Sequence, residues 1–143
     1  MNEDQIRTLY QRIDNLKIDQ KAVWGKMNVS QMICHCADGI RMALGTKKPT
    51  AYGTRSAAEI MALAKAGKIV PTPPGFGQVE GEGTPSVDFE KDRQLLKDLI
   101  MEFSKSDKDF IFAPHAYFGT VTRERWNILV IYHLDHHLKQ FGV

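Results

Sequence analysis

Apolar residues recur at intervals of three and four along four stretches of this chain, and that spacing is typical of amphipathic helices. The predicted helices occupy residues 3–17, 29–44, 87–103 and a last stretch that begins after Thr122. No stretch shows a convincing alternation of apolar and polar residues, which would predict a strand. The pattern therefore predicts an all-α fold, a four-helix bundle whose apolar stripes face one another.

The ends of these helices carry signals of their own. Asn28 can cap the second helix with its side chain, Gln31 three residues later is the reciprocal partner, and Gly45 suits the helix end. Asp88 belongs to an acidic first turn of the third helix, where negative charge is favoured. Thr122 can cap the last helix. These signals place the helix boundaries independently of the apolar spacing.

Residues 46–85 interrupt the helical pattern with a long irregular excursion between the second and third helices. It holds a short Ala-rich segment, RSAAEIMALAKAGK, which is predicted to be helical, and an irregular stretch, VPTPPGFGQVEGEGTPS, with four of the six prolines. Loops of this length in a small domain are usually functional, so we expect it to cover the open end of the bundle. Phe76 would then close over a small apolar substrate. The alternative is a surface loop in which Phe76 packs on a neighbouring helix.

The composition changes this picture little. The chain has 143 residues, a formal net charge of +2 and 25% charged residues, which predict one globular domain over residues 1–143. The basic residues are scattered, so no nucleic-acid partner is indicated. No apolar run approaches the roughly 20 residues that cross a bilayer, and no export signal is evident. We expect a cytoplasmic protein without a membrane partner, with Cys34 and Cys36 reduced.

The histidines supply the candidate chemistry, because three of the five lie in the closing segment YHLDHHLKQFG. At about 100° per residue, His133 and His137 lie about 20° on either side of Trp126, inside the apolar stripe. His136 and Asp135 fall outside the stripe and are predicted to be solvated. On the second helix, His35 lies on the inward stripe that also contains Met32, Cys36, Gly39 and Ala43. Three histidines therefore face the interior from two helices.

A single histidine on an apolar face is usually a core residue with satisfied hydrogen bonds. Three buried imidazoles without partners would cost about 1–3 kcal/mol each, so a shared cation is the simpler explanation. Cys36 is a further candidate ligand, but it is better explained as a small core residue, and Cys34 as a partly covered one. No carboxylate is predicted to point inward beside the histidines, which argues against a dinuclear carboxylate site.

The segments WGKMNVSQMICHCADGIRMALG, PHAYFG and RERWNILVIYHLDHHLKQFG together resemble the DinB-like superfamily, in particular a small branch that ends in H-x-x-x-H-x-x-Q-F-G. The resemblance implies a four-helix bundle in which His35, His133 and His137 bind a divalent metal, with zinc or nickel favoured. It also implies a small-molecule reaction, a thiol S-transferase or a hydrolase, with a low-molecular-weight thiol as one class of substrate.

Two other interpretations stay open at this point: a non-catalytic protein that binds a metal or ligand, and a bundle with structural histidines at a homodimer interface. His115 is a candidate catalytic residue, with a structural turn residue as the alternative. Phe76, Tyr117 and Trp126 are candidate substrate contacts, with core packing as the alternative.

Overall fold

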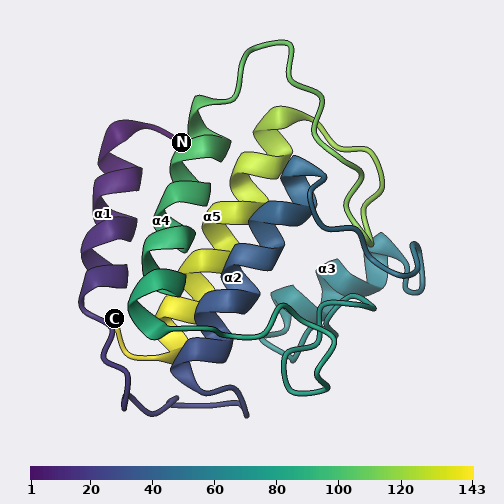
Figure 1. Ribbon diagram of the computed structural model, residues 1–143. Helices are drawn as coiled ribbons and strands as arrows, with labels where there is room; N and C mark the ends of the chain where they lie inside the picture. Colours follow the sequence, from purple (N-terminus) through teal and green to yellow (C-terminus); the bar gives the residue numbers. More distant parts are fainter.

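Five helices and no strands make up the regular structure of the computed structural model, which describes residues 1–143 (Figure 1). The helices are α1 (Glu3–Asp14), α2 (Val29–Leu44), α3 (Ala57–Lys65), α4 (Phe89–Lys105) and α5 (Arg123–Gln140). The prediction of an all-α protein is confirmed, and the Ala-rich segment is helical as well. None of the five has the length and apolar character needed to cross a lipid bilayer.

Helix α2 begins and ends where its sequence signals place it. Asn28 Oδ1 accepts a hydrogen bond from Gln31 N at 2.8 Å, and Gln31 Oε1 accepts from Asn28 N at 2.9 Å. Gly45 follows the helix with φ of 78°, a conformation that glycine adopts without strain. Thr122 caps α5 with its hydroxyl alone, which accepts from Arg125 N. Because these two helices carry the candidate ligands, their capped ends also set the register of the site.

Two predicted boundaries were wrong by a few residues. Helix α1 ends at Asp14 rather than near residue 17, although Leu16 beyond it is only 2% exposed. Leu16 is buried in the following turn, so its apolar character required a buried position and not a helical one. Helix α4 begins after Asp88, which is the N-cap and accepts from Lys91 N at 3.0 Å.

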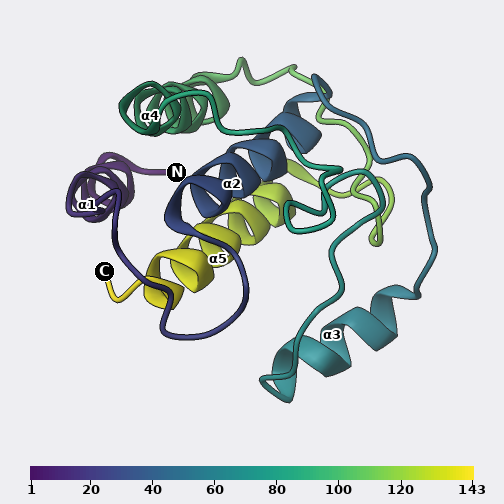
Figure 2. The ribbon, with the colours of Figure 1, turned by 60° about the horizontal axis from the view of Figure 1, so that its bottom comes forward.

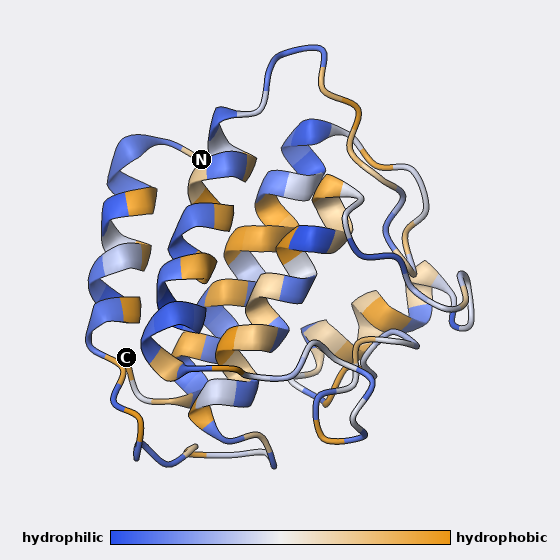
Figure 3. Cartoon of the chain, viewed as in Figure 1, coloured by the Kyte–Doolittle hydropathy of each residue, from blue (hydrophilic) through white to orange (hydrophobic).

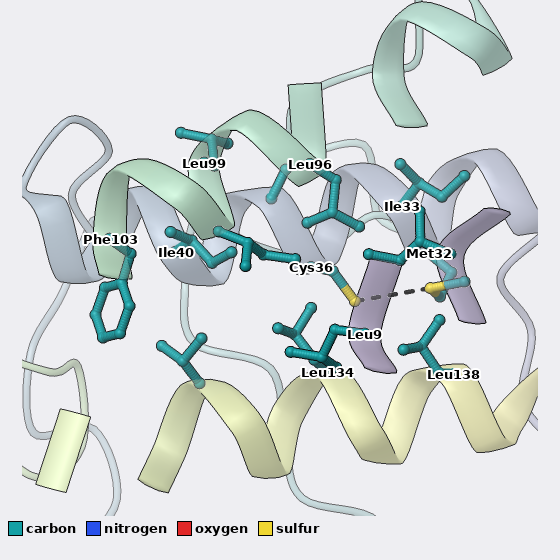
Figure 4. Close-up of a cluster of buried hydrophobic side chains, with 14 of the residues drawn as sticks. Leu9, Met32, Ile33, Cys36, Ile40, Leu96, Leu99, Phe103, Leu134 and Leu138 are labelled. Carbon is teal, nitrogen blue, oxygen red and sulfur yellow. Dashed lines mark hydrogen bonds between the residues drawn. The ribbon is translucent and has the colours of Figure 1, made fainter. Parts of the chain in front are cut away.

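Four of the helices pack together, because α1 and α2 each contact both α4 and α5. The apolar side of α1 faces α4 in Figure 3. Figure 4 shows side chains of α2, α4 and α5 meeting around Cys36, whose thiol lies 3.7 Å from Met32 Sδ. The core therefore lies between the four long helices, with α2 and α5 in direct contact.

Both cysteines are free and buried. Cys36 is the small core residue that was predicted. Cys34 is 5% exposed, so it is more buried than predicted, because it lies against Asp92 of α4. Burial, followed by the charge of Asp92, raises the pKa of the Cys34 thiol to about 12. Burial also raises the pKa of Cys36, so both are neutral thiols at neutral pH.

The excursion over residues 46–85 lies beside α2 and α5, and its helix α3 stands apart from the other four (Figure 2). Its residues Phe76 and Gln78 are nevertheless 1% and 8% exposed. The Gln78 carbonyl accepts from Gln31 of α2, and Thr84 is bonded to Asp38 of α2. The excursion is thus packed onto the helices and does not hang free.

Candidate metal centre

Helices α2 and α5 bring three histidines together where they pack side by side. His35 lies in the second turn of α2, and His133 and His137 lie one turn apart on α5. The ring centroids of the three pairs are 4.7–4.8 Å apart, and the ligand atoms all lie within 4.8 Å of one another. The structure therefore brings together the three residues predicted as ligands, and they could hold a metal ion.

The arrangement of the ring nitrogens fits such an ion. Nε2 of His133 and Nε2 of His35 are 2.9 Å apart. Two nitrogens that share a tetrahedral zinc at about 2.05 Å are about 3.3 Å apart, so only a small adjustment separates the two geometries. The other ring nitrogen of His35, Nδ1, points away from this position and is buried without a hydrogen-bond partner. A donor set of three imidazoles would leave at least one coordination position for another ligand.

The electrostatics of the cluster favour neutral imidazoles, the form that binds metals. Burial lowers the pKa of His35. Burial, then the neighbouring rings of His137 and His35, hold the pKa of His133 well below its ordinary value. For His137, burial and the charge of His35 lower the pKa to about 3. At neutral pH all three rings therefore offer a free lone pair without first losing a proton.

His136 lies outside the cluster, as predicted, but it is not simply solvated. Its exposed ring packs edge-on against His137 with centroids 4.9 Å apart, and Trp24 and Tyr132 pack on it in turn. Asp135 is half-buried and accepts from Arg12 of α1 and from Lys139. The two residues thus cover the outer side of α5 and supply no ligand to the three-histidine cluster.

Gly39 of α2 determines how closely His133 can approach. A Cβ at Gly39 would lie 2.9 Å from His133 Nδ1, a distance that real Cβ atoms essentially never show. The ring of His133 therefore occupies the space that any side chain at position 39 would take. A glycine inside an otherwise apolar helical stripe was the available signal, since glycine in a helix costs about 0.5–1 kcal/mol relative to alanine and needs a reason.

Asp38 is a fully buried carboxylate that the apolar pattern did not predict. Both of its oxygens are occupied: Oδ1 by Arg41 and the Thr84 hydroxyl, and Oδ2 by Lys47 and the Thr84 backbone N–H. Burial raises its pKa, but the hydrogen bonds from Lys47, Thr84 and Arg41 outweigh burial and leave the pKa below the ordinary value. Asp38 therefore fastens the excursion to α2 one turn after His35 and is not a ligand.

His115 is held in a turn by its own ring. Its Nδ1 accepts from the backbone N–H groups of Tyr117 at 3.1 Å and Phe118 at 3.3 Å, so the ring proton lies on Nε2. Burial and the charge of Arg125 lower its pKa to about 4. The ring is therefore a neutral hydrogen-bond donor at neutral pH, which favours the structural interpretation and leaves no free nitrogen for a general base.

The three predicted substrate contacts are all buried. Tyr117 donates its hydroxyl to the Pro71 carbonyl at 3.1 Å, and Trp126 donates its indole N–H to the Ala113 carbonyl at 3.0 Å. Phe76 lies in the main core cluster with the Lys47 ammonium 5.0 Å from its ring centroid. The polar atoms of Tyr117 and Trp126 are used within the fold and Phe76 is 1% exposed, so core packing explains all three without a substrate.

The fold and this cluster define an all-helical protein with three histidines that could hold a metal ion. A family model described as "Protein of unknown function (DUF1569)" matches residues 2–142, and the chain belongs to that family. No curated protein and no solved structure matches the chain.

Proposed function

We propose that this protein is a mononuclear metal-dependent enzyme acting on a small molecule, either an S-transferase for a low-molecular-weight thiol or a hydrolase. The observation that carries the proposal is the convergence of His35, His133 and His137, whose ligand atoms lie within 4.8 Å of one another. The packing of α1 and α2 against both α4 and α5 supports a DinB-like four-helix bundle as the scaffold. Zinc or nickel suits an imidazole donor set.

A divalent ion held there would lower the pKa of a water or thiol ligand, which is the chemistry that both reactions need. The protein contributes three neutral imidazoles, which hold a cation without cancelling its charge. His133 is only partly buried, so a small molecule would approach on its side of the cluster. Nε2–H of His115 is a fixed donor in the turn that precedes α5, available to a polar group of a substrate.

Metal content tests the first half of the proposal. Protein purified without a histidine tag should carry about one zinc or nickel per chain, measured by mass spectrometry of the metal. His35→Ala and His137→Ala should lose it. His136→Ala is the matched control, because it removes an exposed imidazole next to His137, and it should keep the metal. Wild-type protein that cannot be loaded with either metal would reject the proposal.

Turnover tests the second half. Loaded protein should convert members of a panel of low-molecular-weight thiols paired with electrophiles, or of small esters and amides, and His137→Ala should not. Bound metal with no turnover across the panel would favour the non-catalytic metal- or ligand-binding protein instead. Because all three histidines come from one chain, the metal affinity should not depend on the protein concentration, whether or not a homodimer forms.

A further inference from the structure

Gln140 connects the histidine cluster to a distant part of the chain. It lies one turn after His137 on α5 and is 5% exposed. Its Oε1 is 2.8 Å from His137 Nδ1, and its Nε2 donates to the backbone carbonyl of Trp24 at 2.8 Å. Trp24 belongs to the loop between α1 and α2, so this loop is linked to His137 through the side chain of Gln140.

These contacts determine which nitrogen of His137 carries the proton. A backbone carbonyl can only accept, so the amide NH₂ of Gln140 has to face Trp24. The amide oxygen then faces His137 and can also only accept, so Nδ1 of His137 has to be the N–H. In the neutral ring the other nitrogen, Nε2, keeps its lone pair. The hydrogen bonds thus leave Nε2 of His137 as its free acceptor nitrogen.

The loop holds Gln140 by its backbone as well as by its side chain. Val23 N donates to the Gln140 carbonyl at 2.8 Å. The next residue but one, Gly25, has φ of 86°, and a Cβ there would lie well under 3.0 Å from Gln140 Nε2. Glycine is therefore needed at position 25 both for the backbone conformation and for the space that the Gln140 amide occupies.

We propose that Gln140 is a positioning residue that keeps His137 as the Nδ1–H tautomer and so presents Nε2 to the cation, and that Trp24 and Gly25 hold Gln140 in the orientation this requires. The purpose of the arrangement rests on the proposed metal site. Partners of this kind behind a histidine ligand raise metal affinity by about 10- to 100-fold, because the tautomer and ring orientation are set before binding.

Nitrogen-15 NMR of the histidine side chains in metal-free protein above pH 7 tests the tautomer directly. His137 should be the Nδ1–H form in the wild type and a mixture of both forms in Gln140→Met. Gln140→Glu loses the donor to the Trp24 carbonyl but offers an acceptor to Nδ1 in either orientation of the carboxylate, so it should restore the single tautomer. Zinc affinity, measured by competition with a chelator, should fall about 10- to 100-fold in Gln140→Met and recover in Gln140→Glu. Gln94→Met, an exposed glutamine on α4, should change neither readout.

Gly25→Ala tests the role of the loop while leaving Gln140 itself unchanged. The added methyl should displace the Gln140 amide and give the mixed tautomer and the weaker zinc binding of Gln140→Met. Gly142→Ala is the matched control: its φ of 73° imposes a similar backbone strain, but nothing lies within 4 Å of the new Cβ. It should leave the tautomer and zinc affinity unchanged, and circular dichroism would verify that both variants fold.

The inference is overturned if wild-type His137 carries its proton on Nε2, or if Gln140→Met keeps both the tautomer and the zinc affinity of the wild type. Failure of the proposed function gives a different result. In that case the wild type fails to bind zinc or nickel, while the tautomer of His137 still depends on Gln140.

Discussion

Replacing Asp38 with asparagine should destabilise the protein far more than the small change of one atom suggests. The carboxylate is 0% exposed and accepts four hydrogen bonds, two on each oxygen. An asparagine amide has one acceptor oxygen and one NH₂. Whichever way it turns, the NH₂ faces two donors: either Lys47 Nζ and Thr84 N, or Arg41 Nη1 and the Thr84 hydroxyl.

The magnitude follows from the groups left unpaired. Losing a hydrogen bond from a charged partner costs about 1.5–3 kcal/mol, and an unsatisfied buried N–H costs about 1–3 kcal/mol. The Lys47 and Arg41 side chains are 19% and 21% exposed, so water offsets part of the loss. We expect the free energy of unfolding to fall by about 3 kcal/mol in Asp38→Asn, within the range known for breaking a buried ion pair.

Urea unfolding at pH 7 on metal-free protein would measure this loss, with Asp98→Asn on the exposed face of α4 as the control. The double variant Asp38→Asn with Lys47→Met should lose less than the sum of the single variants, because the unpaired ammonium is gone. Release of Thr84 should also make residues 46–85 more sensitive to protease. A decrease in the free energy of unfolding below about 0.5 kcal/mol, the usual range for surface substitutions, would refute the conclusion that Asp38 anchors residues 46–85 to α2.

Three further predictions concern the neighbourhood of the site. Gly39→Ala should weaken zinc binding, measured by chelator competition, because the new Cβ would lie 2.9 Å from His133 Nδ1. Helix propensity alone would instead stabilise α2 by about 0.5–1 kcal/mol, and an unchanged zinc affinity would contradict the close approach of His133 to Gly39. Phe76→Ala should lower the free energy of unfolding, measured in urea, by about 3–5 kcal/mol, as for other buried core aromatic residues. A change near zero would instead favour the interpretation of Phe76 as a lid residue. His115 has a pKa of about 4 in the folded protein and about 6.5 in the unfolded chain, so its contribution to the free energy of unfolding is complete above pH 6.5 and is lost as the pH falls toward 4. The free energies of unfolding at pH 7 and pH 4.5 should therefore differ by about 2 kcal/mol less in His115→Asn than in the wild type. An equal difference in the two proteins would show that His115 titrates normally.

The sequence by itself determined the features that depend on local chemistry. The all-α class and the bounds of α2 follow from apolar spacing, the reciprocal cap of Asn28 and Gln31, and a glycine stop at Gly45. The inward direction of His133 and His137 follows from helix periodicity, because the two share the stripe of Trp126. Such features depend on neighbours within a few residues, so they can be predicted from the chain alone.

Only the tertiary structure decided the features that depend on groups far apart in the chain. Nothing local shows that Asp38 meets Thr84 across 46 positions, or that Gln140 meets Trp24 across 116. Phe76 looked like a lid residue in a loop of glycines and prolines, yet it is buried in the core. A buried polar or aromatic side chain is stable only where its partner lies, and the packing of the helices and of the loops between them determines that place.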